Sequence, residues 1–275
     1  MKDVTIAFIG GGNMARSLIG GLLADGMPPQ NIWVADPNEA TLRDHQQRFT
    51  VHTTADNVEA AHRAQVVVLA VKPQIAKTVA QALAPAVQDQ RPLVISIAAG
   101  IRESDLRAWL GEDTAIVRTM PNTPALVGSG ATALFANPAV NKEQKNLAES
   151  ILRAVGMTLW VDDEGLMDAV TALSGSGPAY FFLIMEAMED AGHRLGLPRD
   201  TARLLTLQTA FGAAKMALES NEELSALRQR VTSPGGTTEH AVKVLQERRL
   251  GAVFDEALRA AHQRSVELAT MFGGK

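Results

Sequence analysis

Short apolar runs alternate with amphipathic stretches along the first half of the chain. The runs are too short for helices and are apolar on successive residues, as in parallel strands that are covered on both faces. The five runs are Val4–Ile9, Ile32–Ala35, Val66–Val71, Leu93–Ile97 and Ala115–Val117. Stretches with helical periodicity between several of them are Met14–Ala24, Glu39–Gln47 and Ile75–Val87. This order predicts βαβ units and a doubly wound parallel sheet.

The pattern changes in the second half of the chain. Ala131–Phe135 and Thr158–Val161 are two further strand-like runs, which we expect to extend the sheet at its far edge. From about Asp162 onward the pattern is helical. The expected helices are Glu164–Leu173, Pro178–Leu195, Pro198–Leu218, Leu224–Val231, Thr238–Glu247 and Val253–Met271. The fold class is therefore α/β, with an N-terminal domain of residues 1–161 built on the sheet and an all-α domain of residues 162–275.

Composition excludes several classes of function. The net charge is −4 without a basic run, so nucleic acid and anionic membranes are not expected partners. The chain has no cysteine, which removes disulfides, thiolate metal sites and cysteine nucleophiles. Its six histidines lack metal-ligand spacing, so we expect no metal. No signal-peptide pattern precedes the first strand, and Glu186 interrupts the most apolar stretch, so we expect a cytoplasmic location.

A glycine-rich turn follows the first predicted strand. Gly10, Gly12 and Ala15 match the G-x-G-x-x-G/A pattern, with a strand before it and a helix after it. Gly10 permits the tight turn, Gly12 lets the backbone approach a pyrophosphate, and Ala15 allows close packing of helix on strand. The helix N-terminus then faces the anion. This context favours a Rossmann-type dinucleotide site over a turn without a ligand.

Asp36 ends the second predicted strand. An acidic residue there accepts hydrogen bonds from the adenosine ribose, which favours NAD and repels the 2′-phosphate of NADP. Arg43, one turn into the following helix, could instead attract that phosphate. Asp36 with Pro37 could also be only a turn and a helix cap.

Later strand ends carry further candidates for the cofactor site. Lys72 and Pro73 follow the run Val66–Val71 at the carboxyl edge of the sheet, where the lysine could act as an acid or pair with an anion, or could simply be solvated. Ser96–Gly100 follows the next strand. Met120–Pro124 places Asn122 between two prolines, in a stiff loop that could present its side chain to a nicotinamide or could merely connect two elements.

Two glycine-rich segments open helices in the second half: Leu173–Tyr180 and Thr232–Thr238. Small residues, hydroxyls and free N–H groups at a helix start suit a carboxylate. In the second segment we expect the N–H groups of Gly235 and Gly236 to converge on an anion, because no Cβ intrudes. Each segment is also a good helix cap, and having two of them makes a pocket the better interpretation.

Taken together, these motifs resemble the pyrroline-5-carboxylate reductase family in order and spacing, over essentially the whole chain. The motifs are Gly10–Ala15, Ala70–Pro73, Ser96–Gly100, Met120–Pro124, Ser174–Tyr180 and Ser233–Thr238. The resemblance implies reduction of L-1-pyrroline-5-carboxylate to L-proline with NADPH or NADH, the last step of proline biosynthesis. It also implies a homo-oligomer, with the helical domain interlocked with its twin in a dimer and such dimers joined in larger rings.

Positions matched to the family supply the candidate residues. The cofactor-binding candidates are Gly10, Gly11, Gly12, Asn13, Met14, Asp36, Ala70, Val71, Lys72, Pro73, Ala98, Ala99, Gly100 and Asn122. The resemblance implies that Gly11, Asn13 and Met14 line the phosphates, and that Lys72, Ala98 and Asn122 flank the nicotinamide. The substrate-binding candidates are Ser233, Gly235, Gly236, Thr237 and Thr238. Thr238 is the catalytic candidate, near the ring nitrogen.

The chemistry asks mainly for orientation and a carboxylate anchor, since hydride passes from the nicotinamide to the C=N carbon. An unperturbed threonine hydroxyl is a weak acid, so we expect Thr238 to orient the imine nitrogen rather than protonate it. Asp36 departs from the neutral or basic residue that many bacterial members have. That departure leaves the choice between NADH and NADPH open.

Two alternatives remain at this point. A β-hydroxy-acid dehydrogenase or related imine reductase would share the two-domain plan and would need a catalytic lysine, either Lys72 or Lys215. A nucleotide-sensing protein without turnover would keep the glycine turn but would not need Ser233–Thr238.

Overall fold

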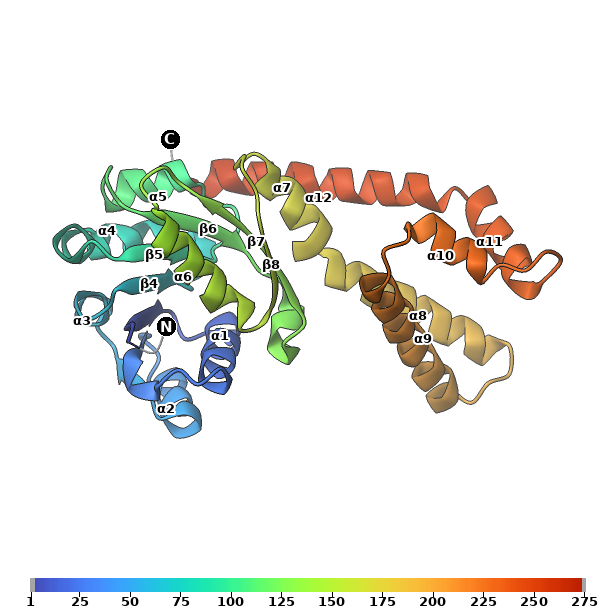
Figure 1. Cartoon of the computed structure of the whole chain (residues 1–275), viewed down its shortest axis with the longest axis horizontal. Coiled ribbons are helices and arrows are strands. Elements are labelled where there is room, and N and C mark those ends of the chain that lie inside the picture. The colour runs from blue at the N-terminus through green and yellow to red at the C-terminus, as the bar shows by residue number, and fades with distance from the viewer. Residues whose placement is uncertain (1–2, 274–275) are drawn as a thin grey trace. The chain divides into compact units, whose positions relative to one another are not determined.

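The computed structural model describes residues 3–273, which form two compact units (Figure 1). The sheet unit comprises residues 3–176 together with 260–273, and the helical unit comprises residues 177–259. The sheet itself ends at Trp160, close to the expected domain boundary after residue 161. The compact units divide the chain later, after Ser176, and return the last residues to the sheet unit.

One eight-stranded sheet forms the centre of the sheet unit, in the order β3-β2-β1-β4-β5-β6-β7-β8. The strands are β1 (Ile6–Ile9), β2 (Ile32–Ala35), β3 (His52–Thr54), β4 (Val66–Leu69), β5 (Leu93–Ser96), β6 (Ile116–Met120), β7 (Gly130–Ala136) and β8 (Gly156–Trp160). The first six strands are parallel, and β7 pairs antiparallel to β6 and parallel to β8. The doubly wound sheet and its extension by the two late strands are confirmed.

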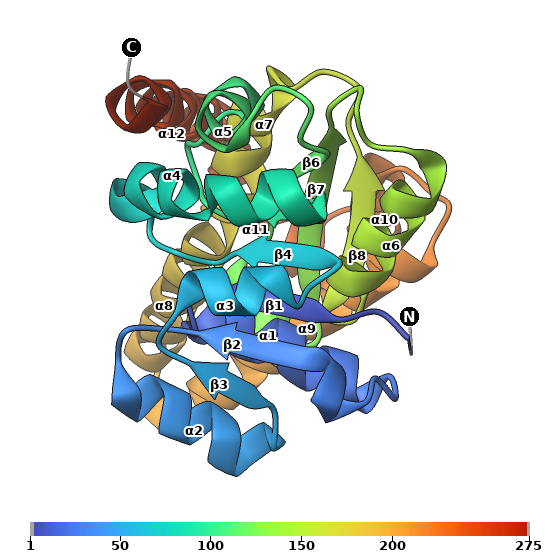
Figure 2. The same ribbon diagram turned by 90° about the vertical axis from the view of Figure 1, so that its left-hand side faces the viewer.

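Helices cover both faces of this sheet, as Figure 2 shows from the side. They are α1 (Asn13–Ala24), α2 (Glu39–Phe49), α3 (Asn57–His62), α4 (Pro73–Gln90), α5 (Glu103–Leu110), α6 (Lys142–Arg153) and α7 (Leu166–Val170). Alternate residues of β1 separate two cores. Ile6 and Phe8 pack with α1, α2 and α6, whereas Ala7 and Ile9 pack with α3, α4 and α5. Strands covered on both faces account for the continuous apolar runs.

The end of α12 (Leu250–Gly273) belongs to the sheet unit and lies beside α5 in both Figure 1 and Figure 2. Ala269 is buried there, and the Ser265 hydroxyl donates to the Asp168 carboxylate of α7 at 2.6 Å. Gly273 packs so closely on Asp105 that an added Cβ would lie 2.5 Å from a carboxylate oxygen. The C-terminal helix is therefore part of the packing around the sheet.

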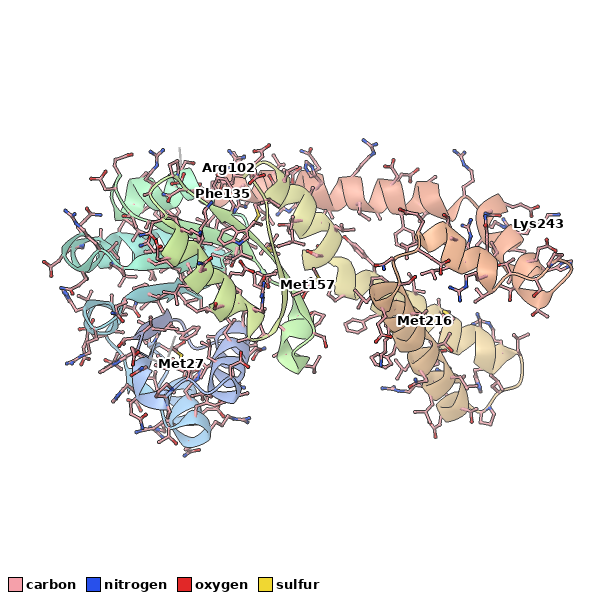
Figure 3. The ribbon with its side chains drawn as sticks, in the orientation of Figure 1. Met27, Arg102, Phe135, Met157, Met216 and Lys243 are labelled. Carbon is pink, nitrogen blue, oxygen red and sulfur yellow. The ribbon has the colours of Figure 1, made fainter. Side chains whose placement is uncertain are left out.

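The helical unit contains α8 (Gly177–Arg194), α9 (Arg199–Glu219), α10 (Leu224–Arg230), α11 (Thr237–Glu247) and the first turns of α12. Each expected helix of this region is present within a few residues. Among residues 177–259 only Gly177, Ala202 and Thr206 are buried. Large apolar side chains are exposed instead, including Met216 of α9, which is labelled in Figure 3. This unit therefore has almost no core of its own.

Candidate functional site

The predicted cofactor residues follow the carboxyl ends of β1, β2, β4, β5 and β6. These five strands are parallel, so their carboxyl ends share one edge of the sheet. Gly10–Gly12, Asp36, Ala70–Pro73, Ala98–Gly100 and Asn122 therefore gather at that edge. Ligands of open α/β sheets bind at this edge, next to the point where the strand order reverses. Here that point lies between β1 and β4.

Gly10 makes the tight turn that the sequence predicted. Its φ of +100° lies in the region that favours glycine, and its N–H donates to the Ala35 carbonyl at 2.8 Å. A Cβ at this position would lie 2.6 Å from the Ala70 carbonyl oxygen. The turn is thus closed against the end of β4, and Gly10 is required for both its conformation and its packing.

Gly12 is exposed and begins the next helix. A Cβ added at Gly12 would meet no atom of residues 3–273 within 4 Å. No side chain caps the N-terminus of α1, and the N–H groups of Asn13, Met14 and Ala15 have no partner among residues 3–273. Free N–H groups and the helix dipole make such an end an anion site. Nothing in the fold of the described chain requires glycine at position 12, so the open space favours a ligand role.

Asp36 is half-buried beside this turn. Its Oδ2 accepts the Gly11 N–H at 2.9 Å, and its Oδ1 accepts the Asn38 N–H at 2.8 Å. Each carboxylate oxygen keeps a further lone pair, so Asp36 can still accept a ribose hydroxyl. Because Gly11 is buried and its N–H is occupied, that group is not available to a phosphate. Arg43 pairs with Glu39 at 2.6 Å on the surface.

The strand ends beyond β1 differ in how open they are. Lys72 is exposed and precedes α4, whose first residue is Pro73. Ala98 is buried, and its N–H donates to the Ser96 hydroxyl at 3.3 Å. Gly100, with φ +75°, packs on Leu268 and Ala269 of α12. Lys72 therefore offers a charge at the edge that pairs with no described residue, whereas the left-handed backbone of Gly100 already accounts for glycine at that position.

Asn122 has a structural task that the sequence did not reveal. Its Nδ2 donates to the Ser174 carbonyl at 3.0 Å, and its Oδ1 accepts the Ala131 N–H at 2.9 Å. Ser174 lies in a π-helical turn, and Pro178, four residues further on, has no N–H to offer its carbonyl. Asn122 therefore ties its loop to the start of β7 and to the π-helical turn that contains Ser174.

The second glycine-rich segment leads into α11, with Gly236 as its N-cap. Gly235 has φ +72°, and its N–H donates to the Glu239 carboxylate at 2.7 Å. The Gly236 N–H donates to the Ser233 carbonyl at 3.0 Å. The expectation that these two N–H groups converge on an anion is therefore wrong for this structure. The first-turn N–H groups of Thr237, Thr238 and Glu239 lack partners among the described residues and are the available donors.

Thr238 is half-buried as the second residue of α11. Its hydroxyl makes no hydrogen bond within residues 3–273, so it is free to bind a ligand. Lys215, the lysine that a hydroxy-acid dehydrogenase would need, is 59% exposed on α9 and lies 3.8 Å from Glu219. Its surroundings are those of an ordinary surface lysine.

A buried polar network around Arg118 of β6 was not predicted. Arg118 of β6 is buried and donates to Glu164 at 2.8 Å, and the same carboxylate oxygen accepts the Glu103 N–H at 2.6 Å. Asn137 donates to the Glu103 carboxylate at 2.9 Å. These contacts fix α5 and the start of α7 on β6. Their partners are tens of residues apart, so no local motif announces them.

Within the part of the chain that the structure describes, no helix combines the length and the apolar character needed to cross a membrane. The same residues contain no group of three metal-ligating histidine or acidic side chains.

Two family models match the chain. Residues 164–268 match pyrroline-5-carboxylate reductase dimerisation, and residues 5–100 match NADP oxidoreductase, coenzyme F420-dependent. The first match covers the helical unit and its connections, and the second covers the glycine turn and β1 to β5.

Individual proteins match over nearly the full length. A pyrroline-5-carboxylate reductase of Pseudomonas aeruginosa is 54% identical over 99% of this chain and 100% of its own. A solved structure of a pyrroline-5-carboxylate reductase from Coxiella burnetii is 52% identical with a TM-score of 0.93, over 96% of this chain and 98% of that one. The pyrroline carboxylate reductase of Plasmodium falciparum, solved with NADP bound, is 31% identical with a TM-score of 0.87, over 98% and 99%.

Proposed function

This chain belongs to the pyrroline-5-carboxylate reductase family, and from that premise we propose that it reduces the C=N bond of L-1-pyrroline-5-carboxylate to give L-proline. This reaction is the last step of proline biosynthesis. The observation that carries the proposal is the uncapped N-terminus of α1, which Gly12 leaves accessible to a ligand. A reductase of this name matches the chain over 99% of its length. NAD(P)H, when bound there, supplies the hydride.

The residues at the sheet edge fit such a cofactor. The N–H groups of Asn13 and Met14 would hold the pyrophosphate, because they have no partner among residues 3–273 and Gly12 leaves the approach open. Asp36 would accept the adenosine ribose hydroxyls with its remaining lone pairs. Lys72 offers a positive charge on the same edge. Asn122 would hold the nearby loop in place. The residues that would line this site are Ala70, Val71, Pro73, Ala98, Ala99 and Gly100.

We propose that the substrate binds at the Ser233–Thr238 segment of the helical unit. Its carboxylate would bind the N–H groups of Thr237, Thr238 and Glu239 at the start of α11, rather than those of Gly235 and Gly236. Gly235 and Gly236 would shape the turn that presents these donors, and Ser233 closes it through its carbonyl. The Thr238 hydroxyl would bind the ring nitrogen.

Thr238 acts as a positioning contact in this scheme. Reduction needs a protonated imine nitrogen, and a free threonine hydroxyl is too weak an acid to supply that proton readily. The substrate takes its proton from solvent, and the Thr238 hydroxyl then orients the ring for hydride transfer.

The helical unit supports assembly into a homo-oligomer. Residues 177–259 bury only three residues, while apolar side chains such as Phe181, Leu204 and Phe211 are more than 60% exposed. A surface of this kind marks an interface. We propose an interlocked dimer, with larger rings of such dimers as a further step, and a cytoplasmic location for the assembly.

The competing functions have less support. The relatives that are 54% and 52% identical over nearly the whole chain are named pyrroline-5-carboxylate reductases, and Lys215 lies on the surface beside Glu219. A sensor without turnover would leave the free donors of α11 and the Thr238 hydroxyl unexplained.

The test is direct. Purified full-length chain is mixed with L-1-pyrroline-5-carboxylate and with NADPH or NADH deuterated at nicotinamide C4. We expect loss of reduced-cofactor absorbance and proline that carries deuterium at the former imine carbon. Oxidation of a hydroxy acid with NAD⁺, without reduction of the imine, would contradict the proposal. Binding of the cofactor without turnover of either substrate would favour the sensor instead.

A further inference from the structure

His45 is a buried histidine that the proposed reaction does not use. It lies within α2, is 0% exposed, and places its Nε2 2.8 Å from the Gly11 carbonyl oxygen. A Cβ added to Gly11 would lie 3.1 Å from that nitrogen and 2.7 Å from the Thr41 methyl group. The middle of the glycine turn is thus packed directly on the side chains of α2.

The partner of this hydrogen bond determines which ring nitrogen donates. A carbonyl oxygen only accepts hydrogen bonds, so Nε2 carries a proton and donates it to Gly11. Nδ1 is buried and has no partner among the described residues. An apolar side chain of similar size would bury no such polar atom. The imidazole therefore costs free energy at this position, and its bond to Gly11 is the contact that offsets the cost.

Both backbone polar groups of Gly11 are hydrogen-bonded to side chains. Asp36 accepts its N–H at 2.9 Å, and His45 donates to its carbonyl at 2.8 Å. Three consecutive glycines have more backbone freedom than any other tripeptide, so an unanchored turn would lose much entropy on binding an anion. Gly11 itself has no group left for a phosphate. Its anchoring instead fixes the direction in which Gly12 and the first turn of α1 face.

The neighbours of His45 keep its ring in place. Asp44 pairs with Arg16 of α1 at 3.0 Å, which joins the two helices beside the ring. The Phe49 ring lies 5.9 Å from the imidazole, one helical turn further along α2. His45 is therefore a fixed donor and not a side chain that samples several positions.

We propose that His45 is a positioning residue for the dinucleotide: it holds the Gly10–Gly12 turn in the conformation that receives the pyrophosphate, without touching the cofactor itself. This inference rests on the proposed binding of NAD(P)H at the glycine turn. It deepens that proposal, because it assigns the organisation of the phosphate site to a side chain of the neighbouring helix.

Three substitutions of His45 and one control separate this role from simple packing. His45→Leu removes the donor. His45→Asn keeps a buried amide, but its nitrogen corresponds in position to Nδ1 and falls short of Gly11. His45→Gln can place its amide nitrogen where Nε2 lies. Phe49→Leu loosens the packing beside the ring and leaves the bond to Gly11 intact.

The primary measurement is the Kd of NADPH and NADH for each full-length protein, by calorimetry without substrate, with the Tm recorded in parallel. We expect His45→Leu and His45→Asn to weaken binding about three- to tenfold, the worth of one hydrogen bond. His45→Gln should remain within twofold of the parent chain. Phe49→Leu should lower the Tm with an unchanged Kd. The KM for pyrroline-5-carboxylate should stay within twofold throughout.

Two outcomes would overturn the inference. One is a Kd for His45→Leu within twofold of the parent, even if its Tm falls. The other is a loss of affinity in Phe49→Leu, or in His45→Gln, as large as in His45→Leu, which would make the effect one of packing. A parent chain that binds neither NADPH nor NADH would instead reject the proposed function, so the two failures are distinguishable.

Discussion

The two units of this chain use apolar residues in opposite ways. In the sheet unit, β1 alone buries four consecutive residues completely, and separate cores cover both faces of the sheet. In the helical unit, 83 residues bury only Gly177, Ala202 and Thr206, although α8 and α9 are rich in leucine, phenylalanine and methionine. The difference is not one of composition. Apolar faces of the sheet unit are covered by the chain itself, whereas those of the helical unit need another chain.

The sharpest test of this contrast is a charge on the helical unit. Phe211 of α9 is 62% exposed. Burying a phenylalanine contributes about 1.5–3 kcal/mol, and a twofold interface counts it twice. We therefore expect Phe211→Glu to weaken the dimer by about 10²–10⁴-fold, and activity to fall with the loss of assembly. Light scattering over a range of concentrations, with the assay run at the same concentrations, measures both.

A matched control exists in the sheet unit. Met157 of β8, labelled in Figure 3, is 53% exposed, and Met157→Glu makes the same kind of change there. We expect this variant to keep the assembly of the parent chain. If the two substitutions disrupt assembly equally, the exposed apolar surface of the helical unit has no special role. A fully active monomeric parent chain would lead to the same conclusion.

The glycine turn offers a second contrast, between Gly10, which packs on the protein, and Gly12, which borders the proposed pyrophosphate site. The added methyl group of Gly12→Ala meets no atom of the described residues within 4 Å, so we expect the Tm of this variant to stay close to that of the parent. Its methyl group would intrude where the pyrophosphate approaches, at a cost of about 1–3 kcal/mol or about five- to hundredfold in cofactor Kd. Gly10→Ala should instead lower the Tm, because its Cβ would lie 2.6 Å from the Ala70 carbonyl. Unchanged affinity in Gly12→Ala would place the pyrophosphate elsewhere.

Thr238 tests the helical unit as the substrate side. If its hydroxyl only orients the imine nitrogen, Thr238→Ala loses one hydrogen bond, or about tenfold in kcat/KM. If Thr238 were the proton donor, kcat would fall by about 10²–10⁴-fold and most strongly at high pH, where little substrate arrives protonated. Steady-state rates of Thr238→Ala and Thr238→Val from about pH 6 to pH 9 distinguish the two roles. A loss beyond a thousandfold that steepens with pH would assign the proton to Thr238.

Asp36 should affect the choice of cofactor more than the rate. Two charges about 4 Å apart in water repel by about 1 kcal/mol, so removing this carboxylate beside a 2′-phosphate changes relative affinity by about fivefold. We expect Asp36→Ser to improve NADPH use relative to NADH by about that factor. The ratio of kcat/KM for the two cofactors is the measurement. An unchanged ratio, in a parent that already prefers NADPH strongly, would mean that Asp36 does not face the ribose.

The elements that the sequence predicted are those whose burial follows from local pattern. The five apolar runs are strands because helices cover them on both faces. The edge strand β3 was missed because His52–Thr54 is short, polar and paired on one side only. Helix α6 was missed because its first five residues are polar and its larger apolar residues, Leu147, Ile151 and Leu152, span less than two turns. Its remaining residues look like a polar connection.

The candidate site could be predicted only as far as backbone motifs reach. The glycine turn and the strand ends lie where the motifs indicated, at one edge of the sheet. The partners of single groups could not be predicted, because they lie far apart in the chain. Asn122 bonds to Ser174 across 52 positions, and His45 bonds to Gly11 across 34. The expectation for Gly235 failed because Glu239, one helical turn later, reaches back to its N–H.

The smallest expected effect belongs to Asp105, where the end of α12 packs on α5 within the sheet unit. Burial raises the pKa of the Asp105 carboxyl above its ordinary value of 3.8, opposed by the hydrogen bond from the Arg102 N–H. The ionised carboxylate therefore destabilises the fold. The stabilising contribution of the protonated Asp105 carboxyl is fully present below about pH 3.8 and is lost as the pH rises through the folded pKa. Asp105→Asn removes this charge and keeps an acceptor for Arg102. At pH 7.5 we expect it to raise the Tm by about 1–2 °C, a small gain because the carboxyl is partly exposed and solvent screens its charge. The gain over the parent chain should shrink as the pH falls towards 4, while assembly stays unchanged because the helical unit is untouched.

Asp162→Asn, at an exposed aspartate of the sheet unit, is the control. A gain that is the same at both pH values, or is shared by the control, would show that the buried charge is not its cause.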